Sequence, residues 1–353
     1  MRDLDAPESF SALDPQGMLG CIAELPQQCE DGWAKALDIE LPQEYCRVDR
    51  VLIVGMGGSA IGGDLLRALL VPECPIPIIV HRDYSLPSFV DRHTLVVACS
   101  YSGDTEETLV GFEQALRSGA SLVSITTGGE LERRTREQGL PLLSYQYESQ
   151  PRAALGYSLM FPLGILQRLG LIGDKSADVA EAVAVMREWR AEIKESVPLA
   201  ENAAKSLAVK LHQHLPVVYG AEHLSEVARR WKGQFNENAK SWAVFDVLPE
   251  LNHNTVAGYP FPLGMPQLAF VLLLTSTLNH PRVRLRFDIT RELLDQHGFA
   301  WETVEARGRG ALAQVLSTIH FGDYVSYYLA MLNEVDPWSI GNIELVKERL
   351  SQS

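Results

Sequence analysis

An apolar run of strand length that ends in glycine and leads directly into a helical pattern limits this chain to few folds. Residues 51–55 read Val-Leu-Ile-Val-Gly, and residues 59–70 follow with helical periodicity. A short, wholly apolar run is typical of a central parallel strand, which helices cover on both faces. The alternation continues to residue 145 and predicts a doubly wound α/β sheet. Its other expected strands are residues 76–80, 94–99 and 121–125, and its other expected helices are residues 105–117 and 130–138.

The second half of the chain repeats this arrangement. Residues 215–220 form another apolar run closed by glycine, and residues 222–240 follow at helical spacing. We therefore predict two tandem doubly wound parallel-sheet domains joined by helices, with a C-terminal helix. The expected divisions are residues 1–155 for an N-terminal extension and the first domain, residues 156–212 for a helical connector, and residues 213–353 for the second domain.

Less regular segments complete the expected elements. Residues 246–254 are expected to begin a helix after a short turn, whereas residues 282–287, with their alternating arginines, suit either a strand or the start of a helix. Residues 1–50 carry no motif, and we expect helices there that cover the first domain. The remaining expected elements are helices at residues 177–194, 199–213 and 309–332 and strands at residues 268–275 and 300–304.

Composition excludes several classes of protein. The chain has 353 residues, enough for two compact units, and carries 31 Lys plus Arg against 45 Asp plus Glu, a net charge of −14. An acidic chain without a polybasic run is a poor candidate for nucleic-acid binding. Its longest apolar run, residues 268–274, is far shorter than the ~20 residues of a bilayer span, and its polar start does not resemble a secretory signal. Five irregularly spaced cysteines without a Cys-x-x-Cys pair predict reduced thiols in a cytosolic protein.

The first candidate binding feature is the turn Gly55-Met-Gly57-Gly58-Ser59 between the first strand and its helix. Glycine lets the backbone approach a ligand closely, and the helix N-terminus offers N–H groups and a positive dipole end. The turn is therefore a candidate anion site, although a purely structural turn would look the same. A nicotinamide dinucleotide fits poorly, because the next strand ends in Val-His-Arg82 and not in an acidic residue; Arg82 would suit only its phosphorylated form.

A second turn narrows the class of anion that the site is expected to bind. The residues Ser100-Tyr-Ser102-Gly-Asp-Thr105 follow the strand at 94–99 and lead into the next helix. Hydroxyl and backbone N–H groups hold a phosphate without a lysine or a metal. The simpler interpretation is that Ser102 or Asp104 is an N-cap of that helix. Because both turns belong at the carboxyl edge of the sheet, together they favour a small phosphate ester.

Candidate groups for chemistry lie in the second half. Glu237, flanked by two asparagines near apolar residues, is a candidate general base, and His253, between two asparagines, is a candidate proton donor. The alternatives are a solvated carboxylate at a helix end and a structural histidine. Neither residue identifies a reaction alone.

At this point the motifs carry a resemblance. The two turns and the tandem layout resemble the sugar isomerase (SIS) fold. Narrower motifs are similar to the bifunctional phosphoglucose/phosphomannose isomerases of archaea and some bacteria, and the resemblance runs from about residue 50 to the C-terminus. These motifs are residues 231–240, 250–255, 320–330, 336–337 and 343–347.

The resemblance implies a role for each matching residue. Glu237 would move a proton between C2 and C1 of the sugar, and His253 would assist ring opening from the partner subunit of a homodimer. Arg152 would stabilise a cis-enediolate, and Lys347 would contact the ring oxygen or a hydroxyl. The reaction implied is interconversion of glucose 6-phosphate with fructose 6-phosphate, with mannose 6-phosphate as a further substrate and no cofactor or metal. The residues expected to bind the phosphate are Gly57, Gly58, Ser59, Ser100, Ser102 and Thr105.

The chain departs from the family at one point. Where the family often reads Asp-Pro-Thr-Pro, this chain has Asp336-Pro-Trp338-Ser339. This difference is expected to affect the acceptance of mannose 6-phosphate more than that of glucose 6-phosphate. Without the resemblance, Arg152 and Lys347 would be a loop charge and a residue of a solvated helix face. Two other functions stay open: a sugar-phosphate-binding regulator without chemistry, and an isomerase of another aldose phosphate or of an amino sugar phosphate.

Overall fold

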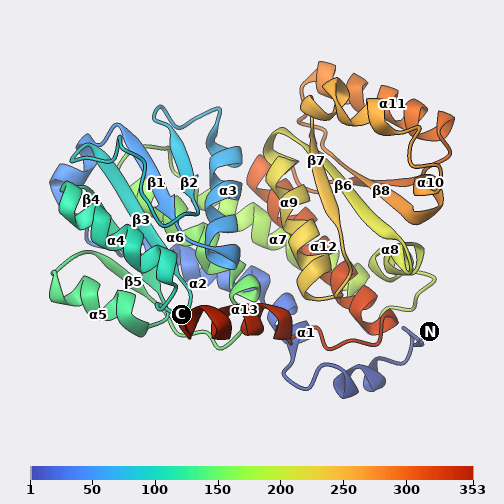
Figure 1. Cartoon of the computed structure of the whole chain (residues 1–353), viewed down its shortest axis with the longest axis horizontal. Helices are drawn as coiled ribbons and strands as arrows, with labels where there is room; N and C mark the ends of the chain where they lie inside the picture. The colour runs from blue at the N-terminus through green and yellow to red at the C-terminus, as the bar shows by residue number, and fades with distance from the viewer. Residues whose placement is uncertain (1, 353) are drawn as a thin grey trace. The chain divides into compact units, whose positions relative to one another are not determined.

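The computed structural model describes residues 2–352, which divide into two compact units (Figure 1). We call Glu24–Arg187 with Gly308–Leu316 the N-sheet unit. The C-sheet unit comprises the chain through Ala23, then Glu188–Arg307, and the chain from Ser317 onward. None of the helices in residues 2–352 has both the length and the apolar character that a bilayer-spanning helix needs.

The N-sheet unit contains a five-stranded, wholly parallel sheet in the order β2-β1-β3-β4-β5. Its central strands are buried along almost their whole length, as their apolar sequences predict. The strands are β1 (Arg50–Val54), β2 (Ile78–His81), β3 (Thr94–Ser100), β4 (Ser121–Thr126) and β5 (Leu142–Ser144). The helices are α2 (Leu25–Leu37), η2 (Gln43–Arg47), α3 (Gly57–Leu70), α4 (Glu106–Ser118), α5 (Gly129–Glu137), η3 (Pro151–Ala153) and α6 (Leu155–Arg168).

Both faces of this sheet are covered because successive strand residues point to opposite sides. Ile53 packs against Gly63 of α3 on one face, and Val54 packs against Gly111 of α4 on the other. In Figure 1, α4 and α5 lie on one side of the strands. The N-terminal part of the chain contributes α2, which packs on α6 where Gly32 faces Met160.

The C-sheet unit contains a four-stranded parallel sheet in the order β7-β6-β8-β9. Helix α9 covers one face, and α11 covers the other over a core that includes Tyr219, Leu273 and Phe287. The strands are β6 (Leu215–Ala221), β7 (Val244–Leu248), β8 (Ala269–Thr275) and β9 (Ala300–Glu305). The helices are η1 (Pro7–Ala12), α1 (Met18–Ala23), α8 (Ala203–Leu211), η4 (Glu222–Leu224), α9 (Ser225–Glu237), η5 (Glu250–His253), η6 (Thr255–Gly258), α10 (Met265–Leu268), α11 (Pro281–Gln296) and α13 (Gly341–Ser351).

Two long helices run through both units: α7 (Ser176–Ile193) and α12 (Ala311–Leu332) each cross a unit boundary. The predicted fold class, two parallel α/β sheets with helices and a C-terminal helix, is confirmed. Several expected elements differ. Strand β5 was not expected, and η1 and α1 belong to the C-sheet unit, although helices before residue 50 were expected to cover the first domain. Residues 244–248 form the edge strand β7, where a helix was expected to begin at residue 246, and short 3-10 helices follow it. Residues 282–287, which suited either structure, lie within α11.

Candidate active site

The first turn follows β1 and opens α3. Gly57, the first residue of α3, has a φ of +48°, which favours glycine. A Cβ added to Gly55 would lie 2.8 Å from the carbonyl oxygen of Cys99, so the two turns approach closely. The Oγ of Ser59 accepts a hydrogen bond from the backbone N of Tyr101 at 3.1 Å. This bond joins the first turn to the second, between strands β1 and β3.

The second turn places its hydroxyls differently. Ser100 is 1% exposed, and its Oγ lies 2.9 Å from Oγ1 of Thr105 while accepting from the backbone N of Gly103 at 3.0 Å. The two hydroxyls carry two protons and share one hydrogen bond, so one proton remains to donate to an anion. Ser102 is exposed and accepts from the backbone N of Asp104 at 3.2 Å.

The interpretation of Ser102 or Asp104 as the N-cap of α4 is wrong. Thr105 is the N-cap residue, and its hydroxyl bonds to Ser100. The carboxylate of Asp104 accepts instead from the backbone N of Glu130 at 2.9 Å, in the first turn of α5. The polar residues of this turn therefore bond to one another and to the start of α5.

Arg152 lies beside the first turn, in the same unit. It belongs to η3, is 2% exposed, and its backbone packs on the start of α3. A Cβ added to Gly58 would lie 2.6 Å from the carbonyl carbon of Pro151 and 2.8 Å from the backbone N of Arg152. Only glycine permits this approach. The structure thus brings Arg152 together with Ser59 and the other predicted phosphate ligands, which we call the cradle (residues 57–59, 100, 102, 105).

Replacing Gly58 with alanine is expected to lower the free energy of unfolding by about 1–3 kcal/mol, because the added methyl group meets backbone atoms that cannot rotate away. Urea unfolding measures the effect. Gly233→Ala in α9 is the matched control, since its Cβ would meet nothing within 4 Å and its φ is not positive. A Gly58→Ala protein as stable as the wild type would show that η3 does not press on α3.

Two features of this edge were not foreseen. Tyr101, a residue of the second turn, bonds to Ser59 of the first turn, and the only signal in the sequence is its place between two serines. Cys99 ends the apolar part of β3, and burial raises the pKa of its thiol to about 12. Its side chain therefore stays protonated near neutral pH and takes no part as a nucleophile.

Glu237 belongs to the C-sheet unit, where it ends α9 and is half-buried. A buried polar network anchors this end of the helix to α12. Asn238 donates to Oγ of Ser326 at 3.0 Å, and Gln234 donates to the carboxylate of Asp323 at 2.8 Å. The same carboxylate accepts from Arg230 at 3.1 Å, with both side chains nearly fully buried. Gln234 and Asp323 lie 89 residues apart, within two of the motifs that carry the resemblance, but the sequence assigned neither of them a role.

His253 and Lys347 are exposed residues of the C-sheet unit. His253 ends η5 next to Asn252, whose amide donates to Oγ1 of Thr290 at 3.0 Å and accepts from Arg286 at 3.3 Å. Lys347 lies in α13. The cradle and Arg152 therefore belong to one compact unit, and Glu237, His253 and Lys347 belong to the other.

The second sheet has a related turn after β6, but a glutamate stands there in place of a glycine. Glu222 lies two residues after Gly220, as Gly57 lies two residues after the glycine that follows β1, and the two φ angles are +51° and +48°. Here the side chain is a carboxylate. Its Oε2 accepts from Asn279 Nδ2 at 2.7 Å and from the backbone N of His280 at 3.1 Å, at the start of α11. A negative group of the chain itself therefore lies where the first sheet has the open glycine turn.

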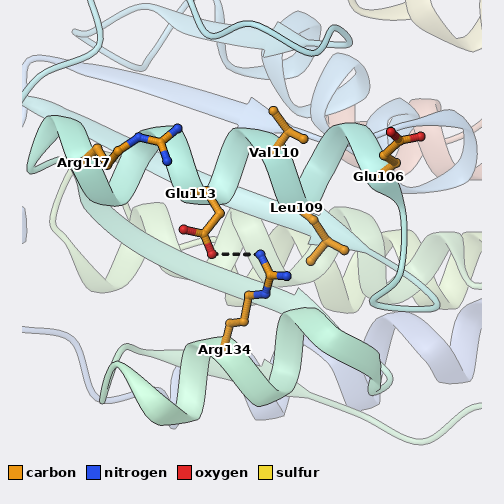
Figure 2. A pocket seen from close by; sticks show the side chains of 6 residues that line it. All are labelled: Glu106, Leu109, Val110, Glu113, Arg117 and Arg134. Atoms are coloured by element: carbon orange, nitrogen blue, oxygen red, sulfur yellow. Dashed lines mark hydrogen bonds and ion pairs between the residues drawn. The ribbon is translucent and has the colours of Figure 1, made fainter.

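A groove of about 380 Å³ lies between α4 and α5. Figure 2 shows Glu113 and Arg134 facing each other across it as an ion pair of 2.8 Å. None of the predicted site residues lines this groove. Among the residues that the structure describes, no group of three or more His, Cys, Asp or Glu side chains is placed to hold a metal ion.

Comparison with protein families gives a match over the C-terminal part of the chain. Residues 200–350 match the model described as the bacterial phospho-glucose isomerase C-terminal SIS domain. This range includes Glu237, His253 and Lys347.

Relatives match over almost the whole chain. A bifunctional phosphoglucose/phosphomannose isomerase of Caldicellulosiruptor bescii is 40% identical over 95% of this chain and 99% of its own length. An enzyme of the same name from Aquifex aeolicus is 36% identical over 86% of this chain and 90% of its own length. Among solved structures, a hypothetical protein of Thermus thermophilus superimposes with a TM-score of 0.76 and 21% identity, covering 98% of this chain and 93% of that one. The structural likeness shows a shared fold.

Proposed function

The chain belongs to the family of bifunctional phosphoglucose/phosphomannose isomerases, and from this premise we propose that it interconverts glucose 6-phosphate and fructose 6-phosphate and also accepts mannose 6-phosphate. It is an enzyme of the isomerase class. The single observation that supports this function most is the cradle, two hydroxyl-bearing turns joined by the bond between Ser59 and Tyr101. They meet between β1 and β3, where the direction of winding reverses in a parallel sheet and ligands bind.

The phosphate is proposed to sit at the start of α3 and α4. The exposed Ser102, the remaining hydroxyl proton of the Ser100–Thr105 pair and the backbone of Gly57 and Gly58 would donate to its oxygens. The positive ends of two helix dipoles add to the attraction. Local donors are needed because the chain as a whole is acidic, with a net charge of −14, and repels an anion at long range.

The proton transfer is proposed to use Glu237 and Arg152. The Glu237 carboxylate takes the proton from C2 of the open-chain aldose, which leaves a cis-enediolate, and returns it to C1. The hydroxyl proton of O2 passes to O1 in the same conversion, which gives the ketose. Arginine stays protonated, so Arg152 stabilises the negative oxygen and does not move the proton. Lys347 would contact the ring oxygen or a hydroxyl. The network of Asn238, Gln234 and Asp323 supports the role of Glu237, because it fixes the helix end that carries the base.

We propose that the active form is a homodimer in which His253 of the partner subunit opens the sugar ring. The exposure of His253 supports this role, since its ring is accessible to another chain while its neighbour Asn252 is held by α11. We also place the protein in the cytosol, an expectation supported by five free cysteines.

Mixing two inactive variants tests the shared site. If His253 acts across the interface, a hybrid of Glu237→Gln and His253→Ala subunits contains one intact site. Random reassociation of equal amounts is then expected to restore about one quarter of wild-type activity. If both residues act within one chain, both sites of the hybrid carry a defect and no activity returns. The control is each variant unfolded and refolded alone.

A coupled assay with glucose 6-phosphate and mannose 6-phosphate tests the activity itself. Turnover above that of the Glu237→Gln variant is expected with both sugars. A thermal shift with fructose 6-phosphate but no isomerisation would instead identify a binding regulator. Parallel assays with amino sugar phosphates and other aldose phosphates decide the substrate. The half-buried Trp338, whose backbone N donates to Asp336 at 2.7 Å, is the residue whose replacement should change the ratio of mannose to glucose turnover.

A further inference from the structure

Tyr101 makes contacts that none of its neighbours in the second turn makes. Its backbone N donates to Oγ of Ser59, and its carbonyl oxygen accepts from the backbone N of Thr127 at 3.0 Å and from Oγ1 of Thr127 at 2.6 Å. Thr127 directly follows β4. The backbone of Tyr101 is therefore bonded to the segment that follows β1 and to the segment that follows β4.

The hydroxyl of Tyr101 reaches a third segment. It donates to the carbonyl oxygen of Tyr147 and accepts from the backbone N of Ser149 at 2.9 Å. One phenol thus pairs with an acceptor and a donor of the same short segment, as the backbone of a neighbouring strand would. Residues 145–150, to which this segment belongs, form neither helix nor strand, so such contacts determine their path.

The ring of Tyr101 is held in its turn by an aromatic cluster. Tyr145 packs edge-on against it, with ring centroids 6.4 Å apart, and Tyr145 contacts Tyr157 and Phe161 of α6 at 4.6 and 5.3 Å. These are favourable geometries for aromatic pairs. The phenol consequently has a fixed direction, and its hydroxyl is a rigid attachment point.

The attached segment leads directly into η3 and Arg152. Arg152 is three residues beyond Ser149, and its backbone packs on Gly58 of the cradle. We propose that Tyr101 is a positioning residue, which holds Arg152 at a fixed place relative to the bound phosphate; this rests on the proposed function of Arg152. Tyr101 would then affect the enediolate through the arginine, without touching the sugar. Misplacement of a charged group by about 1 Å is enough to cost up to 10²-fold in rate.

Tyr101→Phe tests the proposal, because it removes both hydroxyl contacts and keeps the ring. We expect kcat to fall about tenfold while KM and the inhibition constant of inorganic phosphate change by less than about threefold. In an Arg152→Lys background the same substitution should have almost no further effect on kcat, since two changes that act through one group are not additive. Equal fold-losses in both backgrounds would overturn the proposal.

A second measurement does not depend on activity. Hydrogen exchange of residues 146–153 in the presence of inorganic phosphate should be faster in Tyr101→Phe than in the wild type, and unchanged in the control Tyr145→Phe. Tyr145→Phe removes a hydroxyl from the same segment but leaves both contacts of the Tyr101 hydroxyl in place, and it should keep wild-type kcat. Unchanged exchange in Tyr101→Phe would overturn the proposal. If the wild type shows no isomerisation but the exchange difference is present, the proposed function fails and the coupling of Tyr101 to this segment stands.

Discussion

Replacing Glu237 with glutamine is expected to lower kcat at least about 10²-fold while the affinity for inorganic phosphate stays nearly unchanged. Glutamine has almost the same shape as glutamate but cannot take a proton from C2. The residue ends α9 in the C-sheet unit, whereas the cradle belongs to the N-sheet unit, so the substitution should leave the phosphate ligands intact. Initial rates with glucose 6-phosphate and competitive inhibition by phosphate measure the two quantities.

The matched control for this variant is Glu305→Gln, which changes an exposed carboxylate at the end of β9 in the same unit. It should keep wild-type kcat and KM. If phosphate binding collapses in Glu237→Gln while turnover survives, the base has been assigned to the wrong residue. Thermal unfolding of both variants shows whether either change acts through stability.

Replacing Arg152 with lysine is the second substitution with a large expected effect. Lysine keeps the positive charge but loses the planar set of donors, so kcat should fall about 10²–10³-fold, as it does when one donor to a developing oxyanion is removed. Because Arg152 is 2% exposed, lysine is preferable to alanine, which would leave an unfilled space. The ratio of kcat to KM, measured across the neutral and mildly alkaline pH range, separates loss of the oxyanion contact from a change in the base.

Arg134→Lys is the control for this substitution. Arg134 belongs to the same unit, lines the groove of Figure 2 and pairs with Glu113. Its replacement should leave kcat within about twofold, because neither residue of this half-buried ion pair belongs to the cradle. An Arg152→Lys enzyme with wild-type kcat would exclude Arg152 from the chemistry and would also remove the basis for the role of Tyr101.

The central strands could be predicted because burial on both faces demands an uninterrupted apolar sequence, as in residues 51–54 and 94–99. The edge strand β7 could not be predicted in this way. It pairs only with β6 and is largely exposed or half-buried, so its sequence Val-Phe-Asp-Val-Leu includes an acidic residue. The arginines of residues 282–287 alternate for a related reason: α11 buries Val283 and Phe287, four residues apart, and the arginines occupy positions that are not buried.

The site was predictable to the extent that its residues are adjacent in sequence. The glycine turn and the Ser-Tyr-Ser turn each indicate an anion site through residues that are adjacent in the sequence. The sheet topology brings the two turns to one edge. Contacts between distant segments leave no such signal. The hydrogen bond between Tyr101 and Ser149 and the one between Gln234 and Asp323 depend on how the elements pack. None of these four residues belongs to a type that its position in the sequence makes noticeable.

The carboxylate of Glu222 has a consequence for how many ligands one chain holds. The two sheets have the same architecture. In the turn after β6, however, the carboxylate of Glu222 already accepts hydrogen bonds from Asn279 and from the start of α11. An incoming phosphoryl group would meet a like charge there. Repetition of such a sheet is therefore not expected to double the number of substrate molecules bound, and the second unit instead carries the proposed base Glu237 and the proposed ring-opening His253.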